Sequence, residues 1–244
     1  MNLYKYGSAK AVTKPFGANT KMSDLICDNF PLLLIITRFG IPLGFGEKTI
    51  GQVCEEHEVD APTLLLLLNS SVHPEEKPCV EQLSALDIHS LLSYLSNSHS
   101  YFLDFRLPLL RQQLLSALSN CPNEVALAIR NFFDEYVEEV RKHMNYEDKT
   151  VFPYARKLAQ GERDSRYSIR VFSKRHDQIE LKITELKNLL IKYYPAPSGY
   201  ELNNVLHDIF TSEADLAAHN LIEDNIFTPY IEALEDGLIS PQIK

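Results

Sequence analysis

The sequence lacks long apolar segments and an excess of positive charge. Its main apolar runs, residues 31–36 and 64–68, are far shorter than the roughly 20 residues that span a bilayer. The formal net charge is −9, which argues against a nucleic-acid-binding surface. Lysines near the N-terminus are followed by no apolar segment, so no signal peptide is visible. We therefore expect neither membrane nor nucleic-acid partners.

Cysteine is scarce and scattered. The four residues are Cys27, Cys54, Cys79 and Cys121, and no two of them are adjacent or form a CxxC pair. Isolated cysteines in a chain without an export signal are typical of reduced thiols. We expect a cytoplasmic protein without disulfides.

Strand-like alternation of apolar and polar residues is also missing, whereas helical periodicity is extensive. A polar, proline-bearing linker is predicted at residues 73–86, and longer helices follow it. Their short connections make consecutive helices antiparallel, so we expect an all-α, up-down-up-down four-helix bundle over residues 87–236. The expected helices cover about residues 87–118, 123–159, 165–193 and 198–234.

A small helical domain is predicted before the linker, over residues 21–72. Residues 1–20 show no periodicity and are expected to form an extended arm, and residues 237–244 are expected to form a C-terminal tail.

Three short helices are predicted in this N-terminal domain. The first is capped by Ser23 and restarts or kinks at Pro31. The second begins at Thr49-Ile50-Gly51-Gln52, which has capping-box spacing. The third begins at Asp60-Ala61-Pro62.

One pattern occurs twice in the predicted bundle. Starting from a histidine, it has Glu at +4, Asp at +5, Pro at +10 and Tyr at +11, and the two copies begin at His143 and His219. Residues four apart share one face of a helix, so each copy presents an imidazole beside a carboxylate, that of Glu147 or Glu223. The prolines, Pro153 and Pro229, predict a kink or an end of the regular helix.

Two further histidines, His99 and His176, complete the pattern. The steps between consecutive histidines are 44 residues from His99 to His143, 33 from His143 to His176 and 43 from His176 to His219. Antiparallel helices of roughly 25–35 residues would return such positions to one level of the bundle core. We therefore predict one metal site. Its candidate ligands are His99, His143, Glu147, His176, His219 and Glu223.

Imidazole and carboxylate ligands favour iron, manganese or zinc. Four imidazoles and two bridging carboxylates, with a solvent-derived bridge, would provide about five donors to each of two metals and leave one octahedral position open on each. This arithmetic favours a pair of octahedral metals over a single tetrahedral zinc. An open position on a redox metal is where O2 or NO would bind.

Five other polar residues are candidates for supporting roles near the site. Glu139, Asp177 and Asp215 are candidates for orienting the imidazoles, and Tyr146 and Tyr154 for approaching the site. The remaining histidines lack a glutamate at +4 or lie in a linker, so we interpret them as ordinary core or surface residues. They are His57, His73, His89 and His207.

With these motifs in place, the region from about residue 80 onward resembles hemerythrin-like HHE proteins. The N-terminal stretch Thr49-Ile50-Gly51-Gln52-Val53-Cys54-Glu55-Glu56-His57 is similar to the small domain of the iron–sulfur cluster repair di-iron proteins, also called regulators of cell morphogenesis and nitric oxide signalling. The resemblance implies a hemerythrin-like bundle with two non-haem irons, oxo- or hydroxo-bridged, on the six candidate ligands. It also implies repair of iron–sulfur clusters damaged by oxidative or nitrosative stress, with O2 or NO as small ligands and damaged iron–sulfur proteins as partners.

The chain departs from that family at one place. Members usually carry adjacent cysteines followed by glycines, whereas here Pro42-Leu43-Gly44-Phe45-Gly46 has no cysteine. The resemblance therefore does not imply a thiol-dependent role for the N-terminal domain of this chain. Two alternatives stay open: an O2 or NO sensor without turnover, and a metal-free interaction bundle. A homodimer is compatible with the sequence, which assigns no separate acid–base catalyst.

Overall fold

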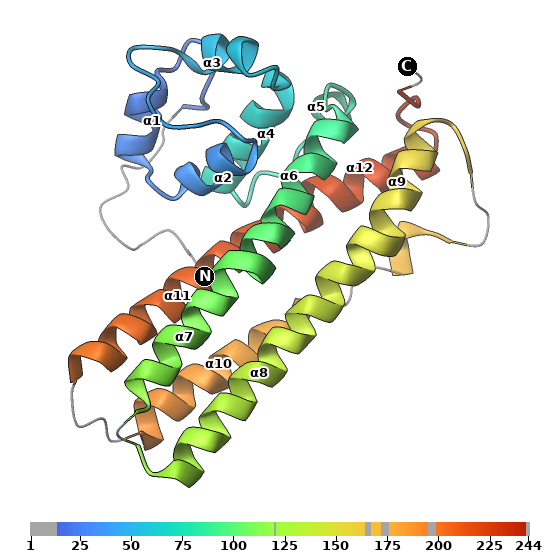
Figure 1. The fold of residues 1–244 in the computed structure, drawn as a ribbon. Helices are drawn as coiled ribbons and strands as arrows, with labels where there is room; N and C mark the ends of the chain where they lie inside the picture. Colours follow the sequence, from blue (N-terminus) through green and yellow to red (C-terminus); the bar gives the residue numbers. More distant parts are fainter. Residues whose placement is uncertain (1–13, 120, 164–166, 172–175, 195–198, 243–244) are drawn as a thin grey trace. The chain divides into compact units, whose positions relative to one another are not determined.

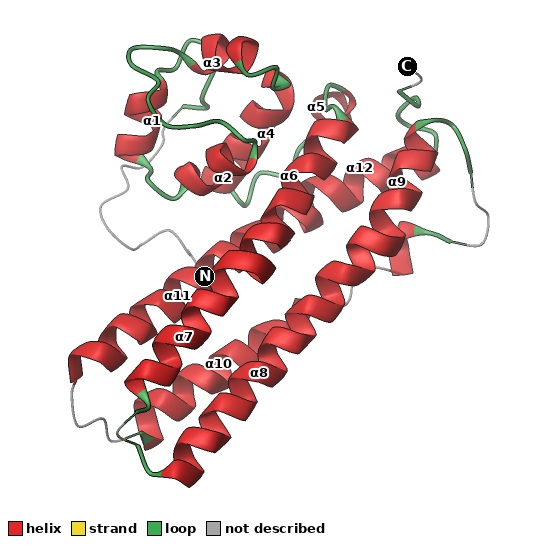
Figure 2. Cartoon of the chain, in the orientation of Figure 1, coloured by secondary structure: helices red, strands yellow, loops and turns green. Residues whose placement is uncertain are grey.

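The computed structural model describes residues 14–119, 121–163, 167–171, 176–194 and 199–242, while the side chains of residues 176–178 and 199 lie outside this description. The described part consists of helices and loops, and its one β-type pairing is an isolated bridge between Lys21 and Thr49 (Figure 2). The predicted all-α fold class is confirmed. None of the described helices combines the length and apolar character needed to cross a membrane.

The chain forms two compact units. The first contains residues 1–98, 152–171 and 218–244, and the second contains residues 99–151 and 172–217. The N-terminal helices belong to the first unit. The long helices of the bundle lie mostly in the second, and α6 (Ile88–Ser100) and α11 (Gly199–Ile222) contribute residues to both. The domain limits expected from the sequence remain a proposal.

Four short helices make up the described N-terminal residues, 14–72. The predicted break at Pro31 occurs, because this residue immediately precedes the second helix. The Thr49 capping box forms, and the Asp60 carboxylate caps the following helix. The prediction that Ser23 caps the first helix is wrong, because Lys21 holds that position without a side-chain hydrogen bond. The helices are α1 (Met22–Asp28), α2 (Leu32–Arg38), α3 (Ile50–Glu56) and α4 (Ala61–Val72).

The stretch predicted as a linker, residues 73–86, contains a short helix, α5 (Val80–Ser84). Leu83 of this helix is buried, and α5 contacts α12 (Thr228–Glu235) within the same unit. This stretch is therefore partly packed rather than wholly extended.

The second unit contains the middle of the four-helix bundle. Its long helices run alternately in opposite directions (Figure 1), and α8 contacts both α7 and α10. Their inward faces form a continuous apolar core that includes Leu114, Phe133, Leu186 and Ile209. The helices are α7 (Leu107–Ala117), α8 (Asn123–Tyr146), α10 (His176–Tyr193) and α11 (Gly199–Ile222).

The predicted kinks take the form of wide π-helical turns. Each π segment is followed by an α-helix whose second residue is a proline, namely Pro108, Pro153 or Pro229. A proline ring clashes with the carbonyl four residues earlier and has no N–H to donate, and a wider turn relieves both problems. The π segments are η1 (Tyr101–Arg106), η2 (Glu147–Val151) and η4 (Glu223–Phe227), which join α6 (Ile88–Ser100) to α7, α8 to α9 (Phe152–Ala159) and α11 to α12.

The expected start of the third long helix near residue 165 is wrong, because α10 begins at His176. The preceding residues 167–171 include a single 3-10 turn, η3 (Ile169–Val171). Glu235 at the end of α12 accepts hydrogen bonds from Ser168 Oγ at 2.9 Å and from the Ile169 N–H at 2.8 Å. Because the Ile169 N–H and the Ser168 hydroxyl donate to Glu235, they do not form the hydrogen bonds of a continuing helix, and these bonds therefore compete with helix formation.

Glu235 should therefore contribute strongly to stability, since it also accepts a hydrogen bond from Tyr154 Oη at 2.6 Å. We expect E235A to lower the free energy of unfolding by about 2–4 kcal/mol, because three donors lose a charged acceptor. Urea denaturation followed by circular dichroism measures this loss. The matched control is D236A: Asp236 is 50% exposed and pairs with Arg170, so its loss should stay within about 0.5 kcal/mol. Equal losses in the two variants would contradict this account.

Candidate metal centre

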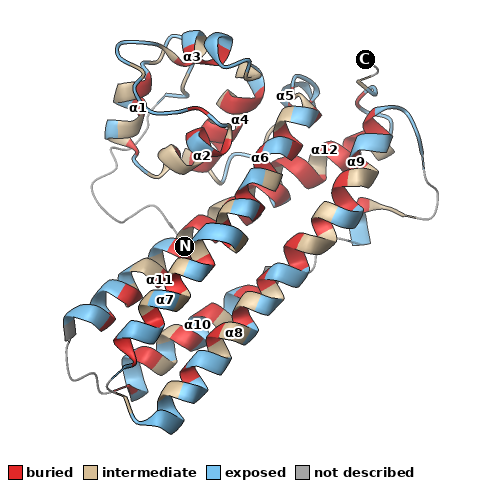
Figure 3. Ribbon diagram, in the orientation of Figure 1, coloured by how far each residue is buried: buried red, intermediate tan, exposed pale blue. Residues whose placement is uncertain are grey.

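Two helices bring polar residues into the core by the same spacing. Along each of them buried positions recur in steps of four and three residues, and the series ends in a histidine and a glutamate. Figure 3 shows buried residues, in red, recurring along these helices. This spacing keeps one stripe of an α-helix facing the interior. The two polar residues therefore occupy positions that the apolar pattern assigns to the core. The series are 129, 133, 136, 140, 143 and 147 in α8–η2, and 205, 209, 212, 216, 219 and 223 in α11–η4.

Burial separates the candidate ligands from most of the other histidines. Glu147, His219 and Glu223 are fully buried, and His99 and His143 nearly so. His176 is the first residue of α10, but its side chain lies outside the described residues. The four histidines that we interpreted as ordinary core or surface residues are less buried: His57, His89 and His207 are exposed, and His73 is half-buried. Burying imidazoles and carboxylates is costly unless they are paired or bind a metal, so these residues need a compensating interaction.

The Glu147 carboxylate contacts two imidazoles with two different oxygens. Its Oε1 lies 3.0 Å from His143 Nε2, and its Oε2 lies 3.1 Å from His99 Nε2. In the second copy of the pattern, Glu223 Oε1 lies 3.1 Å from His219 Nε2.

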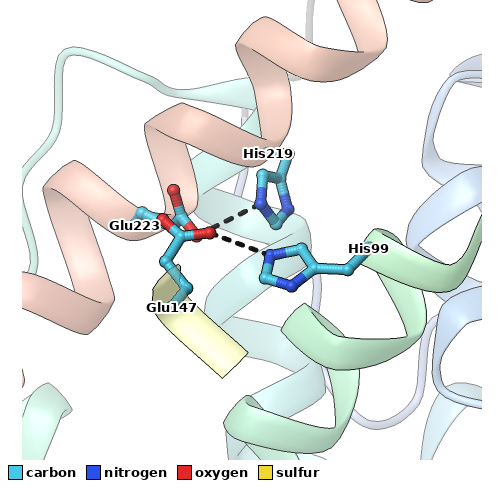
Figure 4. A group of neighbouring side chains, drawn as sticks. All are labelled: His99, Glu147, His219 and Glu223. Carbon is cyan, nitrogen blue, oxygen red and sulfur yellow. Dashed lines mark ion pairs between the residues drawn. The ribbon is translucent and has the colours of Figure 1, made fainter. Parts of the chain in front are cut away.

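Four of these residues form a group in which each offers a ligand atom within 4.8 Å of the others: His99, Glu147, His219 and Glu223. Figure 4 shows the two imidazoles and the two carboxylates pointing toward one another. His143 joins the group through its contact with Glu147.

The arrangement fits a metal. Two ligands about 2.1 Å from one metal and at a right angle to each other lie about 3.0 Å apart, close to the N···O separations seen here. Neither oxygen of Glu147 has a hydrogen-bonding partner of acceptable angle among the described residues. Its two imidazole contacts therefore have the spacing of neighbouring metal ligands rather than the directionality of hydrogen bonds.

Residues 90–231 match a protein-family model, the hemerythrin HHE cation binding domain. The chain belongs to this family. Searches of curated proteins and of solved structures found no match. The hemerythrin HHE domain binds metal cations, and in this chain a buried histidine–glutamate group could hold one. The matched range contains all six candidate ligands, whose roles remain a proposal.

The three residues expected to orient the imidazoles, Glu139, Asp177 and Asp215, have different outcomes. Glu139 accepts a hydrogen bond from Lys142 Nζ at 3.1 Å on the surface, so the structure does not support a role for it at His143. Asp215 is buried one turn before His219, and the side chain of Asp177 lies outside the described residues. Asp148 was missed: its Oδ1 lies 3.0 Å from His99 Nδ1. The signal was its recurrence at +5 in both copies of the pattern.

The tyrosines at +11 have different surroundings. Tyr154 donates its hydroxyl hydrogen to Glu235, which makes it a link to α12 rather than a residue of the site. The Tyr230 hydroxyl is buried and has no hydrogen-bonding partner among the described residues. Burial raises the pKa of Tyr230 to about 12.

These surroundings predict opposite effects of removing the two hydroxyls. Y154F should lower the free energy of unfolding by about 1–3 kcal/mol, because it leaves the partly buried Glu235 carboxylate with one donor fewer. Y230F should leave it unchanged or raise it at neutral pH, because it removes a buried polar group without a partner. Urea denaturation of both variants tests this pair, and a larger loss in Y230F than in Y154F would contradict it.

The raised pKa of Tyr230 also predicts a dependence on alkaline pH. The folded state favours the neutral phenol, so this contribution to stability is complete below the usual tyrosine pKa near 10 and is lost as pH rises toward about 12. The free energy of unfolding of Y230F should therefore fall less over this interval than that of the wild type.

Proposed function

We propose that this protein is a non-haem di-iron protein that repairs iron–sulfur clusters damaged by oxidative or nitrosative stress. The observation that carries the di-iron part is the position of Glu147, whose two oxygens face two different imidazoles at 3.0 and 3.1 Å. A carboxylate that bridges two metals uses one oxygen for each of them. Bundle cores with glutamate and histidine ligands on facing helices are an established setting for di-iron sites.

The proposed ligands are His99, His143, Glu147, His176, His219 and Glu223, with both glutamates bridging. Irons held there would supply one-electron redox chemistry and open positions for O2 or NO. The protein positions the imidazoles, provides the carboxylate charge and excludes water, since the side chains of Glu147 and Glu223 are fully buried. The partners we propose are O2 or NO and damaged iron–sulfur proteins, in the cytoplasm.

A second candidate is an O2 or NO sensor that binds its ligand without turnover. One observation favours it. Cys54 of the N-terminal part is buried, and desolvation raises the pKa of its thiol to about 11. Iron–sulfur repair proteins usually carry a pair of adjacent cysteines that this chain lacks. Because the thiolate is the reactive form, Cys54 is a poor substitute for that pair in handling iron or a cluster.

The di-iron proposal predicts about two irons per chain after anaerobic loading with Fe(II), with near-ultraviolet absorption in air. H143Q and H219Q should lose most of this iron, because each removes a buried ligand. The matched control is H207Q, since His207 is exposed on the same helix as His219 and should keep wild-type iron content. Iron analysis and the absorption spectrum provide the readout. Wild-type iron content in H143Q and H219Q would overturn the assignment.

Repair and sensing are distinguished by turnover. The reduced protein should consume NO over many cycles when supplied with electrons, and it should restore activity to an enzyme whose [4Fe–4S] cluster NO has damaged. Both activities should be lost in H143Q and kept in H207Q. NO uptake that stops at the iron content of the sample, with no restored activity, would contradict repair and support the sensor.

A further inference from the structure

We propose that Asp148 is a positioning residue that fixes the tautomer and orientation of His99 and thereby sets the affinity of the metal site. This inference rests on the proposed metal-binding function. Asp148 is not one of the four converging residues, so it acts through His99.

The two ring nitrogens of His99 face two different carboxylates. Its Nδ1 lies 3.0 Å from Asp148 Oδ1, and its Nε2 lies 3.1 Å from Glu147 Oε2. Two consecutive residues of one helix thus face the two nitrogens of one imidazole supplied by another helix. Since the His99 side chain is only 2% exposed, water can do little to satisfy the nitrogen that carries the proton.

These two contacts determine which nitrogen of the His99 ring carries the proton. A carboxylate only accepts hydrogen bonds, so the contact with Asp148 requires the proton on Nδ1. The neutral ring then has its lone pair on Nε2, facing another carboxylate at 3.1 Å. Two electron-rich atoms at this distance repel each other unless a cation lies between them. Asp148 therefore selects the tautomer that leaves Nε2 available to a metal beside Glu147.

One helical segment holds both carboxylates. Glu147 and Asp148 are the first two residues of the π segment η2. A π turn has more residues per turn than an α turn, so consecutive side chains diverge by a smaller angle and can reach one ring. The two carboxylates also differ in burial. Glu147 is fully buried, whereas Asp148 is 37% exposed and so keeps its charge in contact with water.

The test compares D148A with E139A. Glu139 is the matched control because it is also 37% exposed, lies in the same helical stretch and carries the same charge, but pairs with Lys142 instead of a candidate ligand. We expect the Fe(II) dissociation constant of D148A, measured by competition with a chelator, to rise about 10–100-fold, as is usual for loss of a carboxylate behind a metal-binding histidine. That of E139A should stay within about twofold, because exposed ion pairs contribute little.

A second readout uses metal-free protein and needs no iron. Nitrogen-15 NMR of the histidine side chains, at a pH where the rings are neutral, should report His99 with its proton on Nδ1 in the wild type and in E139A. In D148A the proton should shift partly or fully to Nε2. A merely structural contribution of Asp148 would lower thermal stability without changing this tautomer.

The two proposals fail in different ways. If wild-type protein binds no iron, the metal-centre proposal fails, and the NMR measurement still decides the role of Asp148. If wild-type and D148A bind iron equally tightly, or His99 keeps its proton on Nδ1 in D148A, the role of Asp148 is overturned while the metal centre stands.

Discussion

The Glu147 carboxylate lies where water is excluded, with imidazole nitrogens 3.0 and 3.1 Å from its two oxygens. A buried charge of this kind is tolerated only when other groups neutralise it. His99 and His143 face the carboxylate, but neutral imidazoles do not neutralise it, so a cation held between these groups would meet the requirement. The apolar stripe of α8 carries the carboxylate into the interior. A site that is costly to bury and includes histidines is typical of metal binding, and the family match to residues 90–231 agrees with this.

The π turns connect backbone geometry to these residues. One begins at Glu147, one begins at Glu223, and one begins two residues after His99. Each is followed by a proline that an uninterrupted α-helix would not accommodate well. The prolines therefore force wide turns next to the candidate ligands, where the turn changes the direction in which a side chain points. Single π turns within α-helices often occur at functional sites for this reason.

The repeated pattern does not give repeated surroundings. Tyr154 and Tyr230 hold the same place in the two copies, yet one hydroxyl is hydrogen bonded to Glu235 and the other is buried without a partner among the described residues. The two tyrosines hold the same position along their helices, but the residues that face them from other segments differ. A histidine and a glutamate four residues apart are brought together by the helix itself, so that part of the pattern is alike in both copies.

The sequence alone determined the all-α class, the break at Pro31, the Thr49 capping box and the buried positions of His143, Glu147, His219 and Glu223. Each follows from local geometry: helical spacing, capping chemistry and the restrictions of proline. The tertiary structure decided the rest. Asp148 and His99 are 49 residues apart, and Ser168 and Ile169, which were expected to lie in a long helix, instead hydrogen bond to Glu235 at the end of α12. Such contacts depend on how separate helices approach one another, which the spacing along a single helix does not specify.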